Sequence, residues 1–196
     1  MTPIEVYERL YASPRYESFP NGCPRHDLVR DWVVRNVAPG SSILEVGVGR
    51  GRLMRMLDEA GYVVHGTEFV QRLLFNDLKD VDDRVFLLSC EELGLVETAT
   101  YDCVISSDVI EHLTTEAAAE HALTNMARIT KQWLAVTVGL TTANANTTVA
   151  NLDFDLHRLS KERSWWLAQY GRVAECTLEC YDGQSLFAFG KKREVK

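Results

Sequence analysis

Apolar and polar positions follow two different periods along this chain. Helical spacing of apolar residues predicts helices, and short apolar runs between turn residues predict strands. The predicted helices cover 3–11, 25–37, 52–60, 70–79, 115–130 and 160–170. The predicted strands cover 42–46, 62–67, 84–88, 101–107, 132–139, 172–181 and 184–190. We expect Ser160 to cap the last helix and Gly171 to end it.

Strands alternate with helices from residue 42 onward, and the chain then finishes in two strands joined by Asp182-Gly183, a hairpin turn signal. This order predicts an α/β fold, a mostly parallel sheet with helices on both faces. The hairpin predicts one antiparallel strand at the edge of that sheet. Residues 12–24 carry three prolines and a glycine, and we expect a loop there.

Composition narrows the function classes. A chain of 196 residues fits a single domain, and its net charge of -7 disfavours a nucleic-acid backbone as partner. The five cysteines form no CxxC pair, and the first residues do not resemble a secretory signal. No apolar run reaches the ~18 residues of a membrane helix. We therefore expect a cytoplasmic protein that does not enter a membrane.

The stretch ILEVGVGRG, residues 43–51, places three glycines between the first strand of the alternating region and its helix. Ligands of such sheets bind beyond the carboxyl ends of the strands. Glycine permits a sharp turn and brings backbone close to a ligand. A dinucleotide-binding loop would need a glycine at position 52, where Arg52 stands, so this spacing disfavours an oxidoreductase.

Two acids flank this loop. Glu45 lies just before it, where a carboxylate would repel a pyrophosphate but attract an ammonium or a sulfonium. Glu68 ends the second strand of the region, where a carboxylate can accept hydrogen bonds from the two hydroxyls of a ribose. Together they indicate a cationic ligand that contains a nucleoside.

These motifs resemble those of class I S-adenosylmethionine-dependent methyltransferases of the small-domain type, which includes ubiquinone-pathway and saccharide O-methyltransferases. LEVGVGRG is similar to the family's first motif, Glu68 to its second, LLSCEELGL to its third-strand segment and YDCVISSDVIEHL to its fourth motif. The resemblance implies a Rossmann-like sheet of seven strands. It also implies a methyltransferase domain in residues 41–196, preceded in residues 1–40 by a helical segment that is either a lid over the cofactor or a packed terminal helix.

The resemblance assigns S-adenosylmethionine as the cofactor. Glu45 or its neighbouring backbone would face its amino group and Glu68 its ribose. Cys90 and Glu91 would lie at the edge of its adenine, and Ser106 and Ser107 near its sulfonium. Many members carry Asp where this chain has Ser89, which weakens that adenine contact. The expected cofactor site comprises Glu45, Gly47, Gly49, Gly51, Glu68, Phe69, Ser89, Cys90, Glu91, Ser106, Ser107 and Asp108.

Two histidines are candidates for acting on the methyl acceptor. His112 lies near the end of the fourth motif, after its strand, and many relatives carry a histidine at the position of His157, at the mouth of the substrate site. A general base assists methylation of a hydroxyl. Asp153 and Asp155 alternate with His157, but alternation along an extended stretch arises by chance, so we predict no metal site. We expect the long polar segment 141–155 to shape the acceptor pocket.

The sequence therefore predicts O-methylation of a small molecule or a saccharide. Two alternatives stay open. The chain methylates a nucleic-acid or protein acceptor, or it binds the cofactor as a regulatory protein without chemistry. The oligomeric state, monomer or dimer, also stays open.

Overall fold

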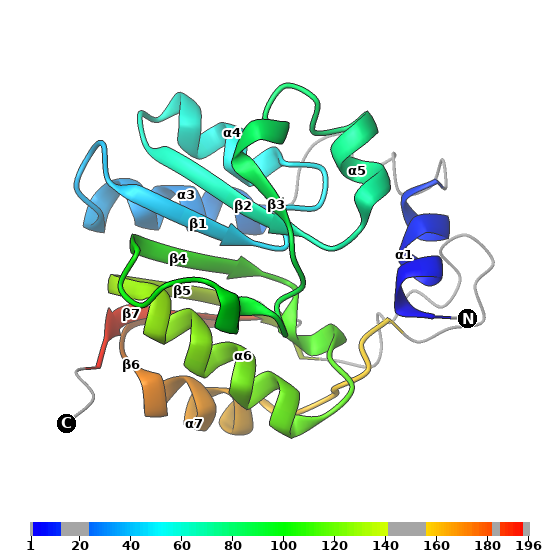
Figure 1. Ribbon diagram of the computed structural model, residues 1–196. Coiled ribbons are helices and arrows are strands. Elements are labelled where there is room, and N and C mark those ends of the chain that lie inside the picture. Colours follow the sequence, from blue (N-terminus) through cyan, green and yellow to red (C-terminus); the bar gives the residue numbers. More distant parts are fainter. Residues whose placement is uncertain (1, 13–23, 141–155, 182–184, 194–196) are drawn as a thin grey trace.

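Seven strands form one sheet in the computed structural model, which describes residues 2–12, 24–140, 156–181 and 185–193 (Figure 1). The strands are β1 (Ser42–Val46), β2 (Val63–Glu68), β3 (Val85–Leu87), β4 (Tyr101–Ser107), β5 (Thr130–Gly139), β6 (Ala174–Tyr181) and β7 (Ser185–Lys192). Their order is β3-β2-β1-β4-β5-β7-β6. The first five run parallel, and β7 is antiparallel to both β5 and β6. The predicted α/β sheet with its C-terminal hairpin is confirmed.

We predicted that the antiparallel strand would lie at the edge of the sheet, but it does not lie at an edge. β7 lies between β5 and β6, and β6 forms the edge. β7 pairs along one side with β5, over seven residue pairs, and along its other side with β6. β6 is therefore left at the edge of the sheet. A hairpin signal shows that two strands pair, but it does not show which of them joins the existing sheet.

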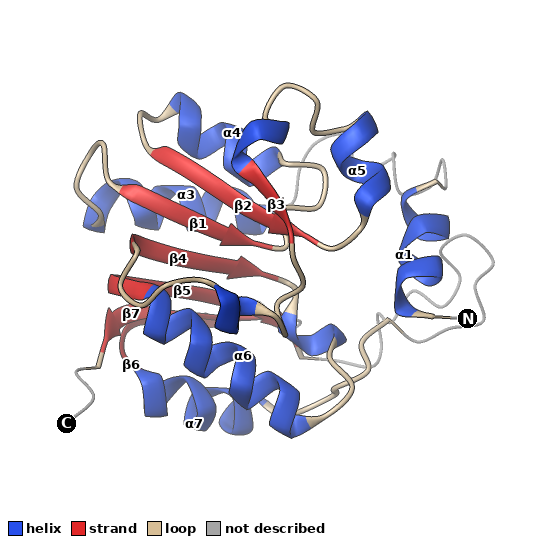
Figure 2. Cartoon of the chain, in the orientation of Figure 1, coloured by secondary structure: helices blue, strands red, loops and turns tan. Residues whose placement is uncertain are grey.

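Helices cover both faces of the sheet, with α3 and α4 on one face and α6 and α7 on the other (Figure 2). The helices are α1 (Pro3–Tyr11), α3 (Pro24–Asn36), α4 (Arg52–Glu59), α5 (Gln71–Asn76), α6 (Glu116–Ile129) and α7 (Arg163–Val173). Within the described ranges, none is long and apolar enough to cross a bilayer.

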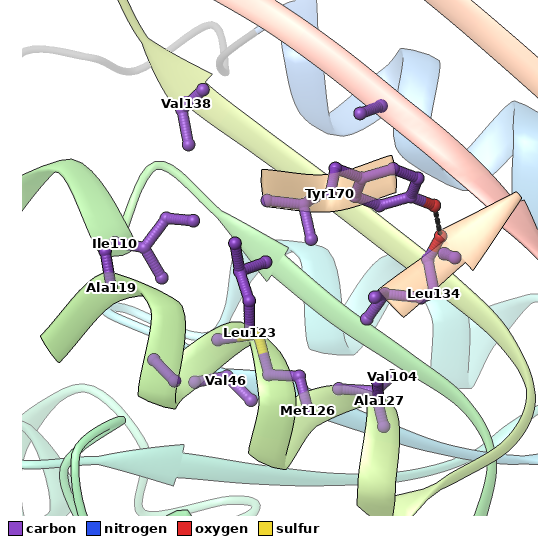
Figure 3. Close-up of a cluster of buried hydrophobic side chains, with 14 of the residues drawn as sticks. Val46, Val104, Ile110, Ala119, Leu123, Met126, Ala127, Leu134, Val138 and Tyr170 are labelled. Carbon is purple, nitrogen blue, oxygen red and sulfur yellow. Dashed lines mark hydrogen bonds between the residues drawn. The ribbon is translucent and has the colours of Figure 1, made fainter. Parts of the chain in front are cut away.

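Each face of the sheet buries its own apolar cluster. On the α6–α7 face, Leu123 and Met126 pack toward β1 and β4, and the Tyr170 hydroxyl donates a 2.6 Å hydrogen bond to the Leu134 carbonyl (Figure 3). On the other face, Trp32 packs against Phe189. The strands between are therefore buried on both sides, as parallel strands are.

The last helix begins and ends later than predicted. Glu162, which is extended, precedes α7 in place of Ser160, and Gly171 lies inside the helix. Gly171 does not adopt a left-handed conformation, so it does not end the helix. Instead the chain passes directly into β6, where Ala174 pairs with Lys192. Strand pairing thus ends the helix without a glycine.

The carboxyl ends of the parallel strands meet at one edge of the sheet. Val46 aligns with Thr67 on one side and with Ser106 on the other, and Ser107 aligns with Thr137. Figure 1 shows α1 beyond the arrowheads of β1 and β4. The loops that follow these strands, together with α1, therefore surround a common site.

Candidate functional site

The glycine loop makes a tight turn at this edge. Gly47, Gly49 and Gly51 all have positive φ angles, of 75°, 53° and 73°, a conformation that side chains rarely tolerate. A Cβ on Gly47 would lie 2.6 Å from Val109, and one on Gly51 would lie 2.5 Å from Leu78. We expected these glycines to let the backbone come close to a ligand. At Gly47 and Gly51, however, the missing Cβ makes room for a side chain of the protein itself.

Gly49 differs, because the only described neighbour that a Cβ there would meet is the Tyr11 hydroxyl of α1, at 3.4 Å. A second tyrosine of α1, Tyr7, stands edge-on to Phe69 and to His112, with ring centroids 5.2 and 5.7 Å away. α1 therefore touches the glycine loop, the loop after β2 and the segment after β4. That this segment acts as a lid stays a prediction.

Glu45 is buried at the end of β1, only 2% exposed. Burial raises its pKa to about 8, a backbone hydrogen bond from Met54 opposes this rise, and the charge of Glu68 adds to it. Its Oε2 has no hydrogen-bond partner among the described residues. A buried carboxylate oxygen of this kind is costly unless a donor reaches it. The site can therefore accept a hydrogen bond from a cation such as an ammonium group.

Glu68 is equally buried but well satisfied. The Gly49 amide donates to its Oε2 at 2.9 Å, and the Phe69 and Val70 amides each donate to its Oε1 at 3.0 Å. Burial raises the pKa of Glu68, and these amides oppose the rise. Glu68 ties the glycine loop to β2. A carboxylate has about four acceptor positions, and three of them are taken by these amides. One position therefore remains for a ligand hydroxyl without any rearrangement, whereas we expected Glu68 to accept hydrogen bonds from two ribose hydroxyls.

Polar residues follow β4 in a connected group. The Asp108 carboxylate accepts a hydrogen bond from Thr137 at 3.1 Å and forms a 2.5 Å ion pair with Arg25. Asp108 also has a positive φ of 56°, a strained conformation that often marks functional sites. Ser107 shares a 3.1 Å hydrogen bond with Thr137. The Ser106 hydroxyl is buried without a partner among the described residues.

The residues expected near adenine lie in the loop after β3. The Ser89 amide donates to the Glu92 carboxylate at 2.9 Å, which turns the loop. Burial raises the pKa of the Cys90 thiol to about 12, and the charges of Glu91, Glu111 and Glu68 add to the rise. Cys90 therefore lies at the same edge as the buried acids.

A second cluster joins the two predicted histidines to an acid that the sequence analysis did not assign. Glu111 is fully buried, and the Gly139 amide donates to its Oε1 at 2.8 Å. The His112 and His157 rings lie 4.9 Å apart. The sequence feature that could have indicated Glu111 is an acid that follows the apolar pair Val109-Ile110 in DVIEHL. Asp153, Asp155 and the segment 141–155 lie outside the described residues.

Comparison with known proteins agrees with this geometry. Residues 44–133 match the model of a family described as a methyltransferase domain. No curated protein matches the sequence significantly. This match indicates a methyltransferase domain over just under half of the chain, in agreement with the predicted resemblance.

Solved structures share the fold at low sequence identity. Magnesium protoporphyrin IX methyltransferase from Synechocystis, with bound S-adenosylhomocysteine, is 18% identical, with a TM-score of 0.70 over 87% of this chain and 82% of that one. A TehB-like S-adenosylmethionine-dependent methyltransferase from Corynebacterium glutamicum is 19% identical, with a TM-score of 0.69 over 97% and 98%. Burkholderia thailandensis 1,6-didemethyltoxoflavin-N1-methyltransferase is 13% identical, with a TM-score of 0.71 over 99% and 92%.

Proposed function

We propose that this chain, whose residues 44–133 match a methyltransferase domain, transfers a methyl group from S-adenosylmethionine to an oxygen of a small molecule or a saccharide. The observation that carries the proposal is the buried Oε2 of Glu45 beside the glycine loop, which has no hydrogen-bond partner among the described residues. An apolar side chain would be cheaper at this position. A carboxylate there is explained if the ammonium group of the cofactor's methionine part binds it.

The other residues of the edge fit the same cofactor. Glu68 has an acceptor position for one ribose hydroxyl, and Gly49 exposes backbone next to it. Ser106 offers a buried, unpartnered hydroxyl at the end of β4. When bound, S-adenosylmethionine supplies an activated methyl group on a sulfonium. We infer that Phe69, Cys90 and Glu91 line the adenine side, and that α1 closes over the site as a lid.

The acceptor side contains His112 and His157. As the acceptor oxygen forms its bond to the methyl carbon and the sulfur–methyl bond breaks, the hydroxyl proton must leave. The two imidazoles stand where they can orient the hydroxyl or take this proton. A small acceptor is supported by the net charge of -7, which disfavours a nucleic-acid backbone. The Burkholderia methyltransferase, of similar size and fold, was solved with the small molecule 1,6-didemethyltoxoflavin.

Calorimetric titration with S-adenosylhomocysteine tests the cofactor assignment. We expect micromolar binding to the wild type, and binding at least about tenfold weaker to Glu45→Gln, because the variant cannot pair with the ammonium. Glu59→Gln, an exposed change on α4, is the matched control. Stabilisation by NADH but not by S-adenosylhomocysteine would refute the proposal. An acceptor screen that begins with sugars and phenols then follows transfer of a labelled methyl group.

A further inference from the structure

We propose that Glu111, His112 and His157 bind one divalent transition-metal ion. One ligand atom from each residue lies within 4.8 Å of the others. The cluster joins the segment after β4 to the segment before α7, so distant parts of the chain assemble it. The site itself is independent of the proposed function, but the role we give the ion, holding the acceptor oxygen, rests on that function.

The two oxygens of the Glu111 carboxylate have different surroundings. Its Oε1 accepts the Gly139 amide at 2.8 Å, which fixes the orientation of the side chain. Its Oε2 is buried and has no hydrogen-bond partner in the described part of the chain. A fully buried carboxylate oxygen without a partner is costly, and a bound cation would satisfy it.

His112 is oriented in the way metal-binding histidines usually are. Its Nδ1 lies 2.7 Å from the Leu156 carbonyl oxygen. Because a carbonyl only accepts, Nδ1 must carry the proton, which leaves the lone pair on Nε2. In many metal sites, a hydrogen bond from the ring nitrogen that does not bind the metal fixes the tautomer and the orientation of the ring.

The segment that carries His157 is fastened on both sides of this residue. Leu156 contacts His112 as above, and the Leu159 amide donates to the Glu111 backbone carbonyl at 2.9 Å. Because Gly139 has no side chain, it leaves room for the His157 ring beside the Glu111 carboxylate. A Cβ there would lie 2.6 Å from Cε1 of His157 and 3.3 Å from Oε1 of Glu111. Any larger residue at position 139 would push the imidazole away from the carboxylate.

The donor set selects the kind of ion. Two imidazoles and one carboxylate suit Zn²⁺ and neighbouring transition metals, whereas Mg²⁺ prefers oxygen ligands. Ligand bonds of about 2.0–2.2 Å place ligand atoms roughly 3.3 Å apart in a tetrahedral site. The ligand atoms, now within 4.8 Å of one another, would therefore move up to about 1.5 Å closer on binding. Three protein ligands leave a position open for an acceptor oxygen. With an ion bound, the two imidazoles would act on the hydroxyl through the metal and would not take its proton themselves. The ion would lower the pKa of that hydroxyl, and its proton would leave to solvent before the methyl group arrives.

The test uses the full chain without an affinity tag, stripped with a chelator and then titrated with Zn²⁺ by calorimetry, and with Co²⁺ by visible absorption. We expect one equivalent of Zn²⁺ to bind, more tightly than Mg²⁺. His157→Ala and Glu111→Gln should each weaken Zn²⁺ binding by about tenfold or more. His121→Ala, at an exposed histidine of α6, should leave the affinity unchanged.

Three results would overturn the site: no stoichiometric Zn²⁺ binding, unchanged affinity in His157→Ala, or tighter binding of Mg²⁺. If the buried Glu111→Gln change prevents folding, the partly exposed His157 still provides the test. S-adenosylhomocysteine binding is measured on the same samples. Cofactor binding without Zn²⁺ binding would overturn the metal site and leave the proposed function standing, and the reverse result would do the opposite.

Discussion

The raised pKa of Glu45 makes the stability of the unliganded protein depend on pH in a defined direction. Its ordinary value is 4.5, and burial raises it to about 8 in the folded state. The folded state therefore holds this proton more tightly than the unfolded chain does. The stabilisation that results is complete below about pH 4.5 and is lost as the pH rises through 8.

The size of the effect follows from the shift. Between pH 5 and pH 7.5, a group with these two pKa values should lower the free energy of unfolding by roughly 3 kcal/mol. Glu45→Gln removes the titration but keeps the shape of the side chain. Any cost of the buried amide is the same at every pH, so the informative quantity is the difference between wild type and variant as a function of pH.

Urea unfolding at pH 5, 6, 7 and 7.5 measures this difference, with the exposed variant Glu59→Gln as the control for the substitution itself. We expect Glu45→Gln to gain roughly 3 kcal/mol relative to wild type across the range. A difference that stays flat would refute the reasoning, because it would mean that Glu45 is ionised in the folded protein. An equal slope for Glu59→Gln would assign the effect to something other than burial.

Three further predictions follow from the same edge of the sheet. S-adenosylhomocysteine binding at pH 7 should release close to one proton from Glu45, seen as a buffer-dependent binding enthalpy that Glu45→Gln lacks. Glu68→Gln should destabilise the protein by about 1–3 kcal/mol in urea unfolding. The glutamine NH₂ group would face one of the three backbone amides that now donate to the Glu68 carboxylate. A change below ~0.5 kcal/mol would contradict this. Gly66→Ala should cost about 1–3 kcal/mol, since its Cβ would lie 2.2 Å from a Val48 methyl carbon, whereas Gly94→Ala, with open space around it, should be nearly neutral.

The fold was predictable from the sequence where local chemistry decides it. The apolar run before Gly47 is buried and becomes β1, and the three glycines take the left-handed conformations that only glycine adopts easily. Glu68 ends its strand as predicted. In each case the residue's own neighbours along the chain carry the information.

What the sequence did not show depends on contacts between distant segments. The Ser160 cap was wrong because α7 begins only after Glu162, and the Gly171 end was wrong because pairing with β7 continues the chain directly into β6. The partner of Glu111 was missed because this partner, the Gly139 amide, lies 28 residues away at the end of β5. Spacing within one motif cannot reveal such a partner.

Three buried acids at one edge show how the site differs from ordinary core. Burial raises the pKa of Glu45, Glu68 and Glu111, so each costs stability that an apolar residue would not. Glu68 offsets this cost with three backbone amides and thereby holds the loop in shape. Glu45 and Glu111 each leave one oxygen without a partner among the described residues. Such oxygens are costly unless a donor or a cation reaches them, and this cost is why we propose an ammonium group at Glu45 and a metal ion at Glu111.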